Sequence, residues 1–299
     1  MKARLGVAPI AWSNDDLPEL GGDTPLETCL KESREAGFSG TETGGKFPKT
    51  SRELKEVLAA HQLKLVSGWY SGRMLENDLA AEKDRAAAQL HLFRDNGASV
   101  IVYGETAGAV HSLRDVPLAR RPRLDDEQMR TYGRKLTEFA EHCHEVGVPL
   151  AYHHHMGDAV QSEGDVDRLM NFTGEAVGLL FDTGHITFAG GDALRMARRH
   201  GARINHVHMK DIRRDVLRSI DFERHSFIDA VLAGVFTVPG DGMIDFKAVA
   251  ALLAEIGYEG WFVVEAEQDP KKANPLEYAR IGFEAMSEAL AEAGYEIED

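Results

Sequence analysis

The regular alternation of short apolar runs with longer amphipathic runs is the feature that most constrains how this chain can fold. Strands that alternate with helices pair in parallel through crossover connections. Eight such units favour closure of the sheet into a (β/α)8 TIM barrel, an α/β fold. The predicted strands are Leu5–Ile10, Gly37–Glu42, Leu63–Tyr70, Ser99–Tyr103, Pro149–His154, Val177–Phe181, Ile204–Met209 and Trp261–Glu265.

The segments between these runs have the spacing of amphipathic helices, and one more helix follows the last strand. Ser51 and Asp125 are predicted caps at two of the helix starts. Glycines that follow the helices and precede strands predict helix ends at Gly37, Gly97, Gly147 and Gly257. The predicted helices are Pro25–Ala36, Ser51–His61, Asp78–Asn96, Asp125–Val146, Glu163–Thr173, Ala193–His200, Phe246–Ile256 and Pro275–Ala293.

The structural alternative is an open, doubly wound sheet, which usually carries a Gly-x-Gly-x-x-Gly turn after its first strand. The corresponding turn here, 11–15, contains no glycine, so the barrel is favoured. A barrel of this kind typically needs about 250 residues. We therefore interpret the 299 residues as one TIM-barrel domain, 1–299, with the long connections Thr106–Arg123 and Ile212–Gly242 as active-site loops.

Charge and composition limit the classes of partner. A formal net charge of −15 argues against nucleic acid, whose phosphates attract basic surfaces. No run approaches the roughly 20 apolar residues of a membrane helix. Cys29 and Cys143 are too few for a disulfide framework and are interpreted as buried thiols. We expect a cytoplasmic protein with a small-molecule partner and no nucleic-acid or membrane partner; homo-oligomerisation stays open.

Polar, metal-competent side chains follow the predicted strands, at the ends where barrel enzymes carry their active sites. Six of the thirteen histidines stand at only three of these ends. Imidazole with carboxylate suits Mn²⁺, Co²⁺, Zn²⁺ or Fe²⁺, and the lack of cysteine ligands favours a catalytic metal site. The segments are Trp12–Asp16, Glu42–Lys46, Trp69–Ser71, Gly104–Thr106, His153–His155, Asp182–His185, His206–Asp211 and Glu265–Asp269.

Each of these features also has a purely structural interpretation. Asp182 could cap a helix that begins after its strand. The histidine run could combine surface side chains with one core histidine, and Glu265 or Glu267 could pair with a nearby cation. Trp12, Trp69 and Tyr70 could be ordinary core residues or a pocket wall. Their joint occurrence at strand ends favours the functional interpretation.

The same residues carry a family resemblance. Asp182-Thr-Gly-His185, His206-Val-His208-Met-Lys210-Asp211 and Val263-Val-Glu265 resemble the xylose isomerase-like barrel superfamily, which includes apurinic endonucleases. A closer resemblance is to the inosose dehydratases of myo-inositol catabolism. It is carried by Gly6–Leu20, Ala36–Glu42, Tyr152–Gly157, Leu180–His185 and Val264–Pro270, which run from end to end of the chain.

The resemblance implies one divalent metal, held by residues on strands 5 to 8. Asp182, His208 and Glu265 match three of the four ligand positions, with the choice between Glu265 and Glu267 open. Strand 5 departs from the pattern, because Tyr152-His153-His154-His155 stands where the superfamily usually has a glutamate. The resemblance then implies His153 as the fourth ligand.

The resemblance also implies an activity, the dehydration of 2-keto-myo-inositol (scyllo-inosose), a polyol ketone, to a trihydroxycyclohexane-1,2-dione. Such a reaction needs a cation to stabilise an enolate, a base for the carbon proton and an acid for the departing hydroxyl. Mn²⁺ or Co²⁺ is the expected metal, and glutathione is reported as an assisting cofactor in that family. The candidate acid and base groups are His155, His185, Lys210 and Glu42, and cationic surroundings would lower the pKa of Lys210.

The residues expected to line the substrate pocket are Trp12, Asn14, Asp15, Trp69, Tyr70 and Glu267. Three other functions stay open at this point. An epimerase or isomerase on the same barrel would form the same enolate and return the proton. An apurinic nuclease would need a multi-metal cluster and a basic surface, and a sugar-binding module would bind a polyol without a metal.

Overall fold

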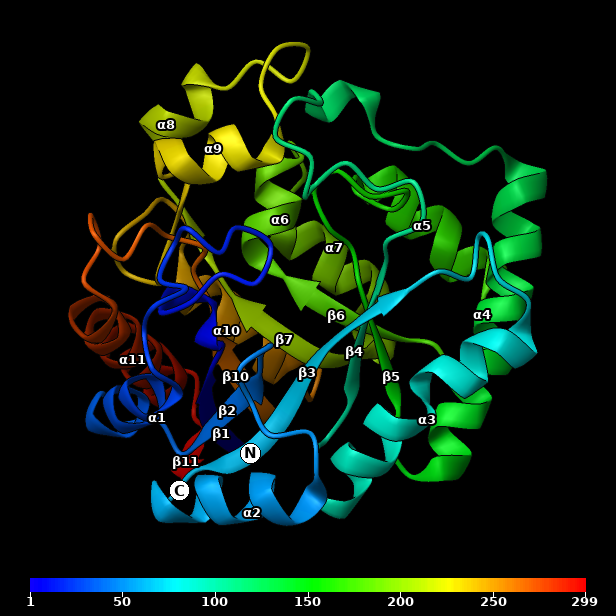
Figure 1. Cartoon of the computed structure of the whole chain (residues 1–299). Coiled ribbons are helices and arrows are strands. Elements are labelled where there is room, and N and C mark those ends of the chain that lie inside the picture. The colour runs from blue at the N-terminus through cyan, green and yellow to red at the C-terminus, as the bar shows by residue number, and fades with distance from the viewer.

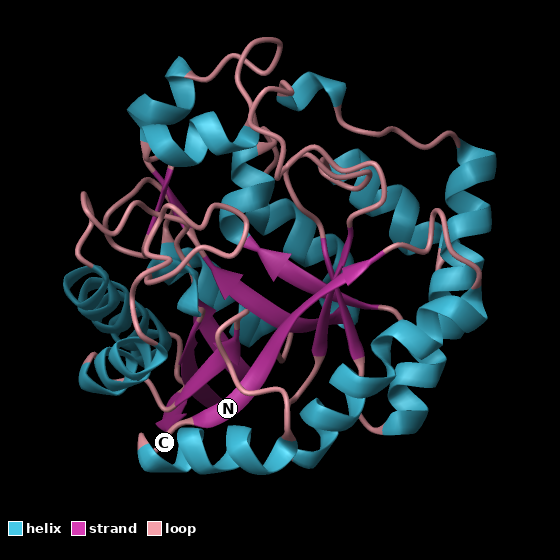
Figure 2. Ribbon diagram, in the orientation of Figure 1, coloured by secondary structure: helices cyan, strands magenta, loops and turns pink.

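The chain folds into a closed barrel of eight parallel strands surrounded by helices (Figure 1; Figure 2). A computed structural model describes all 299 residues. The barrel closes where the first strand pairs with the last, in register from Ala3 opposite Gly260 to Val7 opposite Val264. The barrel strands are β1 (Lys2–Val7), β2 (Gly40–Thr43), β3 (Lys64–Gly72), β4 (Ile101–Glu105), β5 (Leu150–His153), β6 (Gly178–Asp182), β7 (Ile204–Met209) and β10 (Gly260–Val264).

Helices form the outer layer and the upper rim of the barrel (Figure 1). They bury one face each; in α4, for example, Met129, Tyr132, Leu136 and Phe139 recur every three or four residues and are all buried. The helices are α1 (Leu26–Glu35), α2 (Ser51–Ala60), α3 (Leu79–Asp95), α4 (Asp126–Val146), α5 (Glu163–Phe172), α6 (Thr183–Phe188), α7 (Ala193–His200), α8 (Arg214–Ser219), α9 (Phe227–Ala233), α10 (Phe246–Glu255) and α11 (Pro275–Glu292), with short 3-10 turns η1 (Pro9–Ala11), η2 (Leu118–Arg120) and η3 (Gly201–Arg203).

The eight predicted strands and eight predicted helices are all present, with ends shifted by a few residues. The capping box of Asp125 and the left-handed glycines at the four predicted helix ends are confirmed. At the start of α2, however, the cap is Thr50, which accepts from the Glu53 amide, and not Ser51. Thr50 is the residue with extended backbone angles, so its side chain can reach back to the first free amides.

Short elements at the rim and at the C-terminus were not predicted. The segment 212–242 is not a plain loop, because it contains α8, α9 and the antiparallel pair β8 (Asp211–Ile212) and β9 (Phe236–Thr237). Strand β11 (Glu296–Glu298) pairs with β1 and brings the two chain termini together at the end of the barrel opposite α8 and α9 (Figure 1). These pieces have six residues or fewer, apart from α9 with seven, which is too short for a periodic pattern to emerge.

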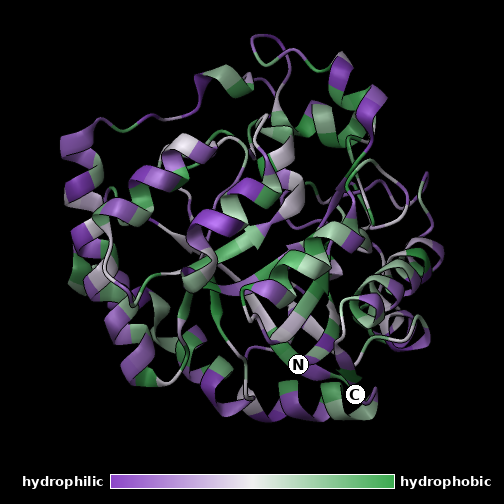
Figure 3. Cartoon of the chain, turned by 180° about the vertical axis from the view of Figure 1, so that it is seen from behind, coloured by the Kyte–Doolittle hydropathy of each residue, from purple (hydrophilic) through white to green (hydrophobic).

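Two apolar clusters hold the molecule together. The larger contains 61 buried residues and fills the layer between strands and helices. Figure 3, coloured by hydropathy, shows strands that are largely hydrophobic and helices that combine hydrophobic and hydrophilic residues. A second cluster of 12 buried residues joins the rim segments, including Leu20, Leu118, Met156, Phe188 and Phe227. This second cluster fixes the loops that surround the mouth of the barrel.

No helix combines the length and the apolar character that crossing a membrane requires. Cys29 and Cys143 are free and buried, as expected from the sequence. Burial raises the pKa of each of these two thiols to about 12. Both cysteines are therefore inert core residues.

Gly147 and Gly164 provide a matched test of the helix-end interpretation. Gly147 ends α4 at φ +97°, and Gly164 lies in the first turn of α5 with open space around it. We expect Gly147→Ala to lower the free energy of unfolding by about 1–2 kcal/mol, the cost of a left-handed alanine. Gly164→Ala should leave it unchanged or raise it by up to about 1 kcal/mol. Urea unfolding measures both; equal effects of the two substitutions would contradict the assignment.

Candidate metal centre

Four side chains from the C-terminal ends of β5, β6, β7 and β10 converge at the mouth of the barrel. They are His153, Asp182, His208 and Glu265, and one donor atom of each lies within 4.8 Å of the others. The strand register brings them together, because Asp182 pairs with His208, and Val263, two residues before Glu265, also pairs with His208. All four predicted metal ligands therefore occupy one place.

The hydrogen bonds of the two imidazoles fix which nitrogen faces this centre. Nδ1–H of His153 donates to the His154 carbonyl at 2.8 Å, so its Nε2 carries a lone pair, 3.5 Å from Oδ2 of Asp182. Nε2–H of His208 donates to Oε1 of Glu42 at 3.1 Å. Nδ1 of His208 is then the nitrogen that faces the centre, and it lies 3.1 Å from Oε2 of Glu265.

Burial would lower the pKa of His208, but Glu42 and Glu265 raise it well above its ordinary value, so a cation at this centre would displace the proton on Nδ1 of His208. Oδ2 of Asp182 and Nδ1 of His208 are buried without any hydrogen-bond partner. Each such atom costs about 1–3 kcal/mol when it is left unsatisfied. Burial alone would raise the pKa of Asp182, but the charge of Lys210 holds it well below its ordinary value, so the carboxylate is ionised. Two carboxylates and two imidazoles fit a divalent cation.

Asp182 serves two purposes at once. Its Oδ1 accepts from the His185 amide at 2.7 Å and caps α6, while its Oδ2 faces the centre. The helix cap is therefore present on Oδ1, while Oδ2 remains available to a cation. The cap also fixes the rotamer that aims Oδ2 at the metal position.

Glu42, from β2, lies behind His208. Its Oε1 accepts from Nε2 of His206 at 2.9 Å as well as from His208, and the Ser67 hydroxyl donates to the same oxygen. Burial would raise the pKa of Glu42, but His208 and His206 lower it well below its ordinary value. An ionised carboxylate behind a metal-facing imidazole holds the ring and increases its basicity as a ligand.

Lys210 lies beneath the carboxylates of β10. Its Nζ is 2.5 Å from Oε1 of Glu265 and 2.9 Å from Oε1 of Glu267. Burial would lower the pKa of Lys210, but Glu265 and Glu267 raise it. This direction is opposite to the lowering expected from the sequence, because carboxylates and not cations surround the ammonium group.

His155 and His185 form a second pair of imidazoles, with ring centroids 3.9 Å apart. Nδ1–H of His155 donates to the Met156 carbonyl at 2.8 Å, which leaves Nε2 as the acceptor. Burial lowers the pKa of both rings well below the ordinary value. Phe227, from α9, packs on both rings at centroid distances of 5.0 and 5.9 Å. Both imidazoles are therefore neutral.

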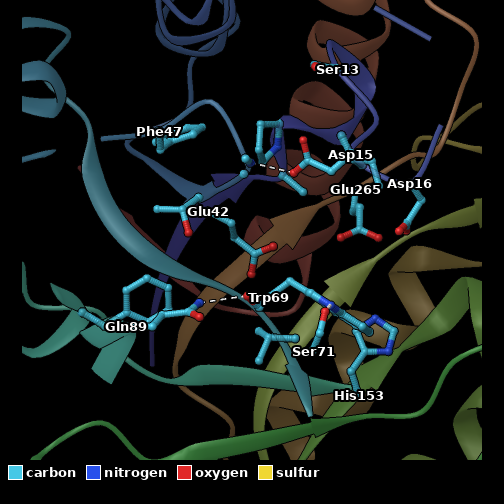
Figure 4. Close-up of a pocket in the computed structure, with 18 of the residues that line it drawn as sticks. Ser13, Asp15, Asp16, Glu42, Phe47, Trp69, Ser71, Gln89, His153 and Glu265 are labelled. Carbon is cyan, nitrogen blue, oxygen red and sulfur yellow. Dashed lines mark hydrogen bonds between the residues drawn. The ribbon is translucent and has the colours of Figure 1, made fainter. Parts of the chain in front are cut away.

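A cavity of about 830 Å³ opens above these groups. Figure 4 shows Glu265, Asp16 and His153 facing the same space from different elements. Three predicted substrate-binding residues, Asp15, Trp69 and Glu267, line this cavity, as do His155 and Glu42. The amide of Gly45 donates to Oδ2 of Asp15, which ties the β1 and β2 loops together.

Trp12, Asn14 and Tyr70 were expected in the cavity, but the structure does not place them there. Trp12 is 1% exposed and donates from its indole to Glu32. The side chain of Asn14 accepts from the Leu17 amide in a turn, and the hydroxyl of Tyr70 donates to Glu82 on the outer side of β3. Strand alternation sends Tyr70 away from the axis that its neighbour Trp69 faces.

Three further polar residues belong to this region, although sequence reasoning did not select them as site residues. Asp16 and His111 line the cavity, and Asp158 lies directly behind His111. Their only signal in the sequence is their position in long connections after strands, which does not separate them from other loop residues. Their placement depends on contacts between loops.

Comparisons with known proteins agree with this architecture. Residues 30–296 match the family described as xylose isomerase-like TIM barrel. The chain is 52% identical to the rhizopine catabolism protein MocC of Rhizobium meliloti, over 99% of this chain and 91% of that protein. It is 43% identical to an inosose dehydratase of Geobacillus thermodenitrificans, over 93% and 94% of the two chains. The solved IolI protein with a bound zinc atom superimposes with a TM-score of 0.70 at 16% identity, over 97% and 99% of the chains.

Asp182→Asn tests the metal centre directly. The substitution retains the cap oxygen but places a neutral amide where the ionised oxygen faces the other donors. We expect metal affinity to fall by more than about 100-fold, beyond what outer partners of a metal site typically cost. Calorimetric titration with Mn²⁺ measures it, circular dichroism checks that the chain stays folded, and Asp15→Asn in the same cavity is the control. Unchanged affinity or full activity in Asp182→Asn would remove Asp182 from the site.

Proposed function

The chain belongs to the xylose isomerase-like TIM barrel family, and on that premise we propose that it is an inosose dehydratase. The reaction is the loss of water from 2-keto-myo-inositol to give a trihydroxycyclohexane-1,2-dione. The enzyme is a hydro-lyase of inositol catabolism. The observation that carries this proposal is the 43% identity to an inosose dehydratase along nearly the whole of both chains.

The geometry of the mouth supports this chemistry. The four acceptors of His153, Asp182, His208 and Glu265 would hold the divalent cation, for which we propose Mn²⁺ or Co²⁺. When bound, the cation supplies Lewis-acid stabilisation of the negative charge that develops on the ketone oxygen. Glu42 holds the His208 ring, and Lys210 holds Glu265 and Glu267 through ion pairs.

We assign the base that removes the carbon proton to His155. Its tautomer is fixed by the bond from Nδ1–H to the Met156 carbonyl, so Nε2 is free to accept a proton. The side chain lines the cavity, and its ring centroid lies 5.5 Å from that of His153. A base beside the four donors would reach the carbon next to a ketone whose oxygen faces them.

His185 and Lys210 lie deeper than His155. Both are 0% exposed and neither lines the cavity, so they act through their neighbours. The His185 ring packs against the His155 ring at a centroid distance of 3.9 Å, and Lys210 forms ion pairs with Glu265 and Glu267. Glu42 lines the cavity but its Oε1 is committed to two histidines, so we assign it to positioning.

A second candidate substrate follows from the 52% identity to the rhizopine catabolism protein. The substrate test therefore compares scyllo-inosose with a rhizopine, each with and without glutathione. The product distinguishes epimerisation of an inosose from dehydration, because only dehydration yields a dione that absorbs light.

The free thiols and the charge of −15 support a cytoplasmic enzyme whose partner is a polyol ketone and not nucleic acid.

Metal removal tests the proposed reaction. We expect EDTA treatment to abolish formation of the dione from scyllo-inosose, because the enolate charge then has no cation beside it. Added Mn²⁺ or Co²⁺ should restore it, and binding of the non-reacting myo-inositol serves as the check for a folded cavity. Full turnover in the presence of EDTA would contradict the proposal, as would the absence of any dione with the metal restored.

Replacement of His155 tests the assignment of the base. His155→Gln should lower kcat by about 10²–10⁴-fold, the range for loss of a general base. Metal affinity should stay near the wild-type value, because His155 is not one of the four donors. Steady-state kinetics and metal titration measure the two effects, and His91→Gln, at an exposed position on α3, is the matched control. A parallel loss of metal binding would assign His155 to the metal instead.

A further inference from the structure

A buried histidine–aspartate pair lies on the cavity wall beyond His155. Nδ1 of His111 is 2.6 Å from Oδ1 of Asp158, and the two side chains are 7% and 2% exposed. His111 lines the same cavity as His153, His155 and Glu265. Its Nε2 has no hydrogen-bond partner in the protein and is not enclosed. The pair therefore presents one free ring nitrogen to whatever occupies the cavity.

The His111 ring continues a row of imidazoles along the wall. Its centroid is 5.0 Å from that of His155, which is in turn 5.5 Å from that of His153. Trp69 contacts all three rings edge-on, with centroids 5.7 to 6.4 Å away. The row leads from the metal donors to the proposed base and then to His111. A substrate bound at the metal would thus extend past His155 toward His111.

The loops that carry the pair are fixed to each other. The Val110 amide donates to the Gly157 carbonyl at 3.0 Å. Gly157 has φ +87°, and a Cβ there would lie 2.9 Å from the His111 amide nitrogen, so only glycine permits this approach. The buried Arg121 donates to the carbonyls of Asp158 and Ala159 at 3.1 Å. These contacts fix the position of Asp158 behind the His111 ring.

The charges around His111 favour its protonated form. Burial alone would lower the pKa of His111, but Asp158, followed by Asp16 and Glu267, raises it to about 9. His155 is the other titratable group that faces the ring, and it is neutral. Arg121 also bonds to this segment: it donates to the carbonyls of Asp158 and Ala159 and pairs with the carboxylate of Asp165.

His111, Asp158 and His155 are close enough to be considered as a second metal site. Their hydrogen bonds argue against it. Nδ1 of His111 already shares a proton with Asp158, and Nδ1–H of His155 donates to the Met156 carbonyl. The centroids of the two rings are 5.0 Å apart, and the carboxylate of the group, Asp158, is already paired with His111 through Oδ1. The pair is therefore built to hold a proton.

We propose that His111, held by Asp158, is the general acid that protonates the departing hydroxyl. This inference rests on the proposed dehydration. His155 takes the proton from the carbon next to the ketone, and the electron pair of the broken C–H bond forms the enolate. The enolate then expels the β-hydroxyl as the carbon–oxygen bond breaks. The leaving oxygen takes the proton of Nε2 of His111 and departs as water, so one proton is removed and one is returned.

The sharpest test compares two leaving groups. An analogue of scyllo-inosose with fluorine in place of the β-hydroxyl releases fluoride, which needs no protonation. His111→Gln should lower dehydration of scyllo-inosose by about 10²-fold or more, yet change elimination of fluoride by less than about threefold. His91→Gln is the control for replacement of a histidine remote from the cavity. Equal losses with both substrates, or full dehydration activity in His111→Gln, would overturn the proposal.

The pH profile gives a second readout. The acid must carry its proton, so kcat/KM of the wild type should fall as pH rises through about 9, the value to which Asp158 raises the His111 pKa. Asp158→Asn removes the charge that raises this pKa, so the fall should move to lower pH. An unmoved alkaline limb in Asp158→Asn would overturn the proposal. A wild type that forms no dione would overturn the proposed function and this inference together, whereas an active wild type with a fully active His111→Gln would overturn only this inference.

Discussion

The structure depends on one constraint, that two carboxylates and two imidazoles converge at the barrel mouth, where Oδ2 of Asp182 and Nδ1 of His208 have no hydrogen-bond partner. Such an arrangement is unfavourable in a low-dielectric interior unless a cation occupies it. The surrounding hydrogen bonds maintain this arrangement. Glu42 accepts from one ring nitrogen of His208, and the His154 carbonyl accepts from one ring nitrogen of His153, so the other nitrogen of each ring faces the centre.

Charge is distributed in layers around this centre. Lys210 pairs with Glu265 and Glu267, and the neutral ring of His155 neighbours both His153 and His111. One wall thus contains imidazoles in opposite protonation states. Burial keeps His155 neutral and a carboxylate keeps His111 charged, which is how one protein supplies a base and an acid at the same pH.

The rim cluster explains why these side chains hold their places. Leu118, Met156 and Phe227 come from three different connections and pack in one apolar group. Phe227 also packs on His155 and His185, which fixes the orientation of both rings. The connection 212–242 therefore acts as a packed wall, because its two short helices, α8 and α9, pack into the rim cluster (Figure 1).

The sequence predicted the eight strand–helix units, because apolar periodicity is local, and the polar strand ends at the mouth, because strand ends fall at fixed places on a barrel. The four candidate metal donors came from the family resemblance, and the structure brings them together. The sequence could not separate Glu265 from Glu267, since alternation puts both on one face; in the structure Glu265 lies with His153, Asp182 and His208, and Glu267 lies with His155 and His185. It placed Trp12 and Tyr70 in the cavity, and their bonds to Glu32 and Glu82 turn them elsewhere. The pairing of His111 with Asp158 spans 47 residues between two loops, and only tertiary contacts create it.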